Sequence, residues 1–123
     1  MGGVTLVAAA IEVGTGLFLM VQPAALVWLL LGADLSQPGL VVGRIAGIAL
    51  LTLGLACWPR HEAASRKTRI PFALLAYNLL ITLYLAYLGI GTGSVGLLLW
   101  PAVAVHAALS IALIHVQFFR SAT

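Results

Sequence analysis

Charged side chains are scarce in this chain of 123 residues. Asp, Glu, Lys and Arg together make up 7% of the sequence, with three acidic and six basic residues, whereas they make up about 25% of a typical soluble domain. So few charges cannot cover the surface of a soluble fold of this length, which excludes a soluble globular domain. The basic residues are also clustered, so the net charge of +3 does not indicate a nucleic-acid-binding surface.

Paired cysteines and the common catalytic motifs are also missing. Cys57 is the single cysteine, which excludes an intramolecular disulfide and any redox or zinc site built on two thiols. No glycine-rich phosphate loop opens a helix, no HExxH motif is present, and no serine lies beside a suitable base and acid. These absences disfavour an enzyme for a soluble substrate. We also expect no metal site, because the central His106 has no second ligand at a usable spacing.

Long apolar segments dominate the sequence. It is 63% hydrophobic, with a mean hydropathy of +1.15, and a helix needs about 20 apolar residues to cross a bilayer. Pro23 interrupts the first apolar segment, and residues 24–32 are too short to span but too apolar for an aqueous loop. We therefore predict an all-α, four-helix transmembrane bundle forming one domain, residues 1–123, with a short extra apolar helix between helices 1 and 2. The predicted spans cover residues 4–22, 39–58, 71–88 and 97–118.

The distribution of basic residues predicts the orientation of the chain. Four of the six lie within residues 59–69, PRHEAASRKTR, and Arg120 follows the last span. Cytoplasmic loops of membrane proteins carry an excess of Lys and Arg. We therefore expect a multipass protein of the cytoplasmic (inner) membrane, with the 59–69 loop and both termini in the cytoplasm.

Each predicted span carries one polar residue near its middle. A charged residue there costs at least about 2.5 kcal/mol on insertion scales and normally faces the protein interior. The polar stripes lie at similar depths, so we expect them to meet inside the bundle. This predicts a mid-membrane pocket, open toward the outer leaflet, that binds a ligand. Its predicted lining consists of Glu12, Arg44, Asn78 and His106, flanked by Thr82 and Ser110.

Structural explanations of the same residues remain open at this point. Glu12 and Arg44 could form an ion pair that only clasps helices 1 and 2 together. Asn78 could simply hydrogen-bond across helices, and His106 could be a satisfied core residue. The tyrosines and tryptophans, Tyr77 among them, mostly fall where aromatic belts belong. Small residues of helix 2 form one stripe that a neighbouring backbone can approach closely, namely Gly43, Gly47 and Gly54.

The order of motifs along the chain resembles a known family. A proline follows helix 1, and an R-x-x-G motif from Arg44 to Gly47 precedes LGLACW in helix 2. A basic loop, an asparagine-bearing helix 3 and WPAVAVH in helix 4 come next. Over nearly the whole chain this order resembles the small bacterial DoxX-like four-helix integral membrane proteins. The resemblance implies the fold and, for some members, a likeness to accessory subunits of membrane oxidoreductases. It implies no catalytic residues.

These observations favour a binding or accessory function over catalysis. We expect a multipass membrane protein that is either an accessory subunit of a membrane complex or a binder of a lipophilic small molecule of quinone or isoprenoid type. One alternative is a membrane enzyme, an isomerase or oxidoreductase component, that uses Glu12 and His106 as acid and base. Another is a small dimeric transporter. The expected partners are the lipid bilayer, such a small molecule, and other membrane subunits or a second copy.

Overall fold

The computed structural model describes residues 2–58, 70–93 and 95–119, and every regular element in this part is helical. Four helices are long and apolar enough to cross a membrane, which confirms the predicted all-α bundle and makes the chain a multipass membrane protein. The short extra helix, α2, is also present. The elements are α1 (Gly2–Val21), α2 (Pro23–Leu31), α3 (Gln37–Ala56), α4 (Ile70–Tyr87), its π-helical continuation η1 (Leu88–Thr92) and α5 (Leu99–Phe119).

Local sequence signals fix the helix boundaries. Pro23 occupies the first turn of α2, where its missing N–H does no harm. Ser36 caps α3 by accepting a hydrogen bond from Gly39 N at 3.2 Å, so this helix begins two residues before the predicted start at Gly39. The basic segment 59–69 and Arg120, on which the predicted orientation depends, lie outside the described residues.

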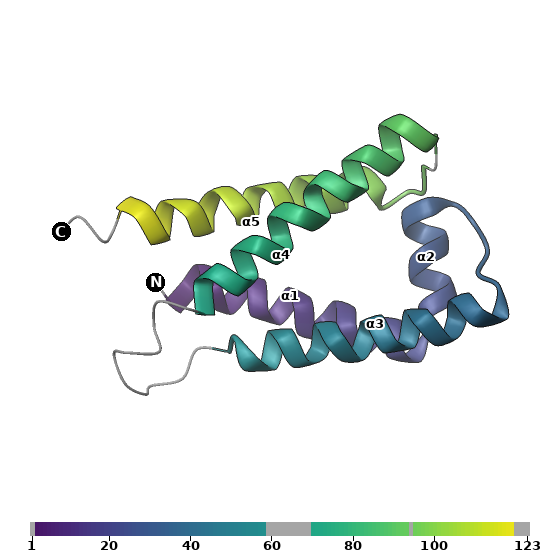
Figure 1. Ribbon diagram of the computed structural model, residues 1–123, viewed down its shortest axis with the longest axis horizontal. Helices are drawn as coiled ribbons and strands as arrows, with labels where there is room; N and C mark the ends of the chain where they lie inside the picture. The colour runs from purple at the N-terminus through teal and green to yellow at the C-terminus, as the bar shows by residue number, and fades with distance from the viewer. Residues whose placement is uncertain (1, 59–69, 94, 120–123) are drawn as a thin grey trace.

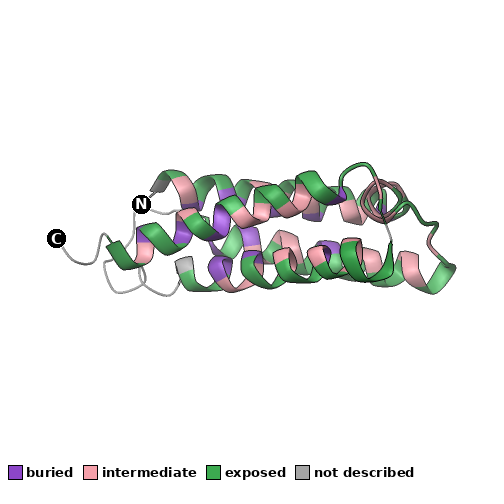
Figure 2. Ribbon diagram, turned by 90° about the horizontal axis from the view of Figure 1, so that it is seen from above, coloured by how far each residue is buried: buried purple, intermediate pink, exposed green. Residues whose placement is uncertain are grey.

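The long helices form two pairs. α1 packs chiefly against α3, α4 packs chiefly against α5, and the two pairs make fewer contacts with each other. α1 and α4 begin at the same end of the molecule, where α3 and α5 end, and α2 lies at the opposite end (Figure 1). Most of the buried residues lie in the half of the molecule in which α1 begins (Figure 2), and the core cluster there draws on all four long helices or their ends. A functional site is therefore expected in the interior between the two helix pairs.

Glycines bring α1 and α3 into backbone contact. A Cβ added at Gly16 would lie 2.6 Å from Leu51 N and 2.7 Å from Gly47 O, and one at Gly54 would lie 2.8 Å from Ala9 O. Such distances leave no room for a side chain, so the helices approach as closely as their backbones allow. The close helix approach predicted for the glycine stripe of α3 is confirmed.

The short helix α2 joins the two pairs. It ends at Gly32, whose φ of +66° is the left-handed conformation that favours glycine. Its last carbonyls, those of Leu29 and Leu30, accept hydrogen bonds from Leu98 N at 2.8 Å and Gly96 N at 3.0 Å. These two donors belong to the connection between η1 and α5, so α2 closes the bundle at this end.

The apolar core lies toward the opposite end, where α1 begins. It contains one or two residues from each long helix or its end: Ala8, Cys57, Leu74, Leu75, Leu109 and Leu113. On three of the helices, a polar residue lies one turn from this core, on the side away from the start of α1. Glu12 comes four residues after Ala8, Asn78 comes four after Leu74, and His106 comes three before Leu109. The apolar core therefore supports a layer of polar side chains near mid-membrane.

Candidate functional site

A hydrogen bond between Asn78 and His106 joins α4 to α5 in the polar layer. The Asn78 side chain is fully buried; its Nδ2 donates to Leu74 O, and its Oδ1 lies 2.8 Å from His106 Nδ1. A carbonyl oxygen can only accept, so the Leu74 bond fixes the amide orientation and His106 Nδ1 must carry the hydrogen. In the neutral imidazole, Nε2 is then a hydrogen-bond acceptor.

The two flanking hydroxyls are bound within their own helices. Thr82 Oγ1 donates to Asn78 O at 2.7 Å, and Ser110 Oγ donates to His106 O at 2.8 Å. Each hydroxyl hydrogen is therefore used one turn back along the helix, although each oxygen can still accept. Both residues lie beside Asn78 and His106, as predicted from the spacing of four, but they offer no donor to a ligand.

Glu12 is fully buried on α1, and its carboxyl is incompletely satisfied. The Tyr77 side chain lies close enough to interact with it, yet neither carboxyl oxygen makes a hydrogen bond of good geometry within the described residues. Tyr77 is therefore a partial hydrogen-bond partner of the carboxyl and does not satisfy it fully. A buried carboxyl without partners costs several kcal/mol if it is ionised. We therefore expect a group outside the described residues to hydrogen-bond to the Glu12 carboxyl.

Tyr77 connects Glu12 to the asparagine and histidine. Besides interacting with the carboxyl, its ring meets the His106 ring edge-on, with 6.0 Å between centroids and an angle of 80°. The sequence pattern did not predict this role for Tyr77, because tyrosines of spanning helices are typical of aromatic belts. Tyr77 directly precedes Asn78 and lies seven residues inside α4, whereas belt residues lie near helix ends. Its position away from the helix ends indicates that Tyr77 faces the interior.

Arg44 does not join the other predicted site residues. It is exposed on α3, and no ion pair links it to Glu12 within the described residues, so the predicted clasp is not formed there. The close contact of α1 with the Gly47 and Gly54 face of α3 explains this arrangement. Arg44 lies beside that face, and its side chain is left outside the helix pair. The structure thus brings Glu12, Asn78 and His106 to one layer and places Arg44 elsewhere.

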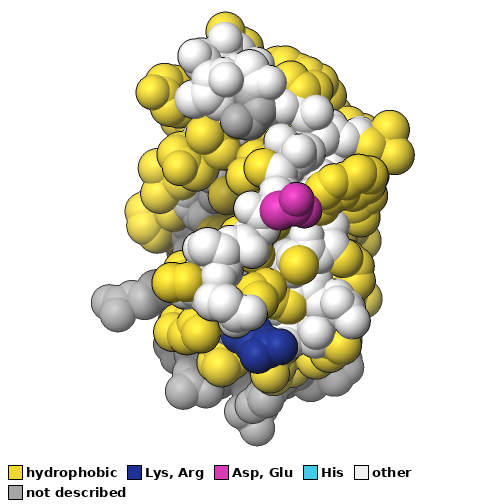
Figure 3. All heavy atoms as spheres, turned by 90° about the vertical axis from the view of Figure 1, so that its right-hand side faces the viewer, with side chains coloured by type: hydrophobic (Ala, Val, Ile, Leu, Met, Phe, Trp, Pro, Cys, Tyr) yellow, Lys and Arg dark blue, Asp and Glu magenta, His cyan; other side chains and the backbone are white. Residues whose placement is uncertain are grey.

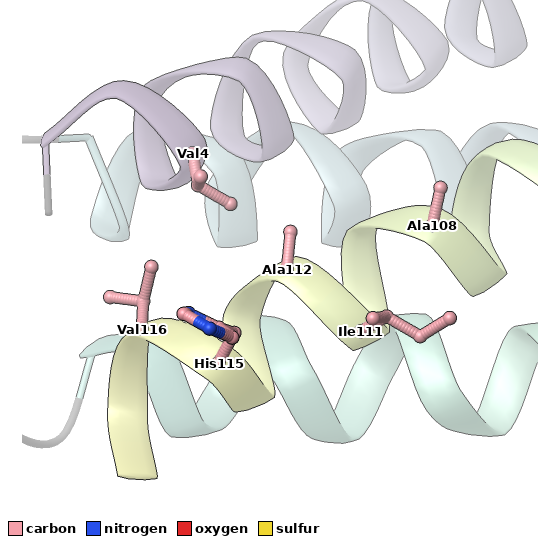
Figure 4. A pocket seen from close by; sticks show the side chains of 6 residues that line it. All are labelled: Val4, Ala108, Ile111, Ala112, His115 and Val116. Atoms are coloured by element: carbon pink, nitrogen blue, oxygen red, sulfur yellow. The ribbon is translucent and has the colours of Figure 1, made fainter. Parts of the chain in front are cut away.

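An open surface hollow of about 500 Å³ lies between α1 and α5, on the side where α1 begins. Figure 4 shows Val4 of α1 facing Ala112 of α5 across it. Its lining is apolar apart from one histidine: Val4, Ala108, Ile111, Ala112, His115 and Val116. None of the predicted pocket residues lines it, so the predicted pocket around Glu12 stays a prediction.

The hollow and Glu12 share one face of α1. Val4 precedes Glu12 by eight residues, which places both on the same side of the helix, about 12 Å apart along its axis. Within the described residues, no group of three or more His, Cys, Asp or Glu could hold a metal ion. The chemistry offered here is therefore hydrogen bonding at Glu12 and His106, and apolar contact further along α1.

No protein-family model, curated protein or solved structure matches this chain. The resemblance to DoxX-like proteins therefore stays a prediction, and the chemistry of the site must be inferred from its own residues.

The Asn78 to His106 bond predicts one neutral tautomer. Nitrogen NMR of the protein in detergent micelles should show the hydrogen of neutral His106 on Nδ1. Asn78→Leu should remove that preference. A double-mutant cycle with His106→Phe should give a coupling free energy of about 0.6–1.7 kcal/mol, as for interhelical hydrogen bonds in membranes.

Thr82→Val is the matched control for that measurement, because it removes only a hydroxyl bound to its own helix. It should leave the tautomer unchanged. A histidine with its hydrogen on Nε2 in the unmodified protein would contradict the hydrogen-bond assignment.

Proposed function

We propose that this multipass membrane protein binds a lipophilic small molecule of quinone or isoprenoid type, whose polar headgroup lies beside Glu12 and His106. The observation that carries this proposal is the fully buried Glu12 carboxyl, whose oxygens make no hydrogen bond of good geometry within the described residues although the Tyr77 side chain lies close enough to interact with them. Buried polar groups are nearly always satisfied, and an unsatisfied one requires an explanation. A ligand headgroup would supply the missing partner.

The available atoms suit a small oxygen-bearing headgroup. A protonated Glu12 can donate to a carbonyl oxygen, and an ionised Glu12 can accept from a hydroxyl. His106 Nε2 can accept from a hydroxyl, because Asn78 holds the hydrogen on Nδ1. A quinone presents carbonyls, and its reduced form or an isoprenoid alcohol presents hydroxyls. Both ligand types therefore match this pair of side chains.

The open apolar hollow between α1 and α5 offers a surface for the apolar tail. It lies on the Glu12 side of α1, and its lining is apolar apart from His115. Val4 lies about 12 Å along α1 from Glu12, and the buried Ala8 of the apolar core lies between them, so a tail that reaches this hollow has to displace core side chains. The proposal therefore includes an orientation, with the tail directed toward the end of the molecule where α1 begins.

Thermal unfolding in phosphatidylcholine nanodiscs tests the proposal. The ligands are decylubiquinone and farnesol, and farnesane serves as an isoprenoid without a headgroup. A ligand at 100 times its Kd stabilises the folded protein by about 2.7 kcal/mol. We expect such a rise in Tm with at least one headgroup-bearing ligand and none with farnesane. Glu12→Met and His106→Phe should abolish it.

Thr52→Val is the control, because Thr52 is an exposed residue of a spanning helix that bonds only carbonyls of its own helix. The Thr52→Val variant should show the same ligand-induced rise in Tm as the unmodified protein. Equal stabilisation of the Glu12 variant, or of the protein by farnesane, would contradict a headgroup site. Chemical conversion of the bound ligand would instead favour the enzyme over the binder.

A further inference from the structure

Arg44 is an exposed cation on a membrane-spanning helix. It is the only lysine or arginine among the described residues, and no hydrogen bond or ion pair joins it to another described residue. Figure 3 looks onto the end of the molecule where α3 begins and shows one dark-blue side chain open on the surface. A charge at lipid depth requires a partner. For Arg44 that partner must come from outside the described protein.

The position of Arg44 directs its side chain toward one membrane surface. Arg44 is the eighth residue of α3, so its Cα lies about 10 Å inside the start of that helix. Side chains of a helix point toward its N-terminus, and arginine extends its long stem along apolar surface to reach polar surroundings. The guanidinium is therefore directed to the headgroup level on the side where α3 begins.

A second copy of this chain is a poor source of the missing anion. Within the described residues the acids are Glu12, which is fully buried, and Asp34, which lies in the connection before α3. Glu12 is enclosed, and Asp34 lies outside the spans, so a second copy would reach Arg44 only if its own connection before α3 packed against this helix. Phospholipid phosphates, by contrast, line the membrane surface toward which the guanidinium is directed, and arginine binds phosphate with two parallel hydrogen bonds.

We infer that Arg44 holds the phosphate of a phospholipid on the outer face of α3. The same face offers contact for an acyl chain, because Ile48 and Leu55 follow Arg44 at helical spacing, Val41 precedes it by three residues, and all are exposed. α3 is also the least covered of the four spans, with 11% of its apolar window buried. The site thus combines one cation with a continuous apolar surface, as a phospholipid requires.

Native mass spectrometry of the protein in dodecyl maltoside, which has no phosphate, tests this inference. Palmitoyl-oleoyl phosphatidylglycerol is added in one series, and dioleoylglycerol, which lacks the phosphate, in another. The phospholipid should bind and dioleoylglycerol should not. Arg44→Gln should weaken phospholipid binding about tenfold or more. Arg44→Lys should retain part of it, and Thr52→Val, on the same helix, should change nothing.

Two results would overturn the inference. The first is phospholipid binding that Arg44→Gln leaves unchanged or that dioleoylglycerol reproduces. The second is a dimer or larger complex that persists without lipid and dissociates in the Arg44→Gln variant, because Arg44 would then bind another protein chain. Circular dichroism of each variant checks that it remains helical, and Arg44→Lys provides the comparison if Arg44→Gln does not fold.

Discussion

Replacing Gly16 by alanine should destabilise the bundle far more than the same change at Gly14, two residues earlier on the same helix. A Cβ at Gly16 would lie 2.6 Å from Leu51 N and 2.7 Å from Gly47 O, whereas a Cβ at Gly14 would meet nothing within 4 Å. The contacting atoms at Gly16 are backbone atoms of α3 and cannot turn away. The helices must separate, and overpacking of this kind costs about 1–3 kcal/mol.

Unfolding in mixed micelles of dodecyl maltoside and sodium dodecyl sulfate, followed by circular dichroism, measures this difference. Gly14→Ala should leave the free energy of unfolding unchanged or raise it slightly, because alanine is the better helix former. Gly47→Ala should behave like Gly16→Ala, since its Cβ would lie 2.7 Å from Gly16 O. Equal stability of the Gly14 and Gly16 variants would show that α1 and α3 do not pack through these glycines.

The features that could be predicted from the sequence are those that membrane physics fixes locally. A spanning segment in lipid must satisfy its own backbone, so length and hydropathy were enough to locate four helices. Pro23 was enough to separate α2 from α1. The glycine spacing in α3 predicted a close helix contact because small residues are required there whichever helix packs against them.

The direction of Arg44 could not be predicted in this way. Helical periodicity places it beside the glycine face of α3, but a residue beside a contact face can point inward or outward. The choice depends on which helices cover the remaining sides of α3. In this fold α1 packs chiefly against α3, and α4 packs chiefly against α5. No neighbour therefore encloses Arg44, and its side chain remains exposed.

The contact between Asn78 and His106 could be predicted only in part. Depth predicted that both residues would face the interior, and their hydrogen bond at 2.8 Å agrees with that. The part played by Tyr77 depends on the packing of α1 against α4, which periodicity alone does not reveal. The hollow beside Val4 likewise depends on how far α1 lies from α5. Features of this kind follow from helix arrangement rather than from any one segment.

Replacing Glu12 by methionine should make the protein more stable while it removes headgroup binding. The carboxyl is fully buried, and neither oxygen makes a hydrogen bond of good geometry within the described residues. Leaving a buried polar group unsatisfied costs about 1–3 kcal/mol, and an apolar side chain of similar volume avoids that cost. A gain in stability with a loss of function is expected at a site that is kept for binding.

Asn78→Leu is the matched comparison, because Asn78 is equally buried but fully engaged. Its removal leaves His106 Nδ1 without an acceptor, so stability should fall by about 1–3 kcal/mol. Two buried polar residues in one layer should therefore respond with opposite signs in the same micelle unfolding assay. If Glu12→Met instead destabilised the protein, and Arg44→Met restored the loss, the two charges would be partners. Glu12 would then serve to clasp helices together rather than to bind a headgroup.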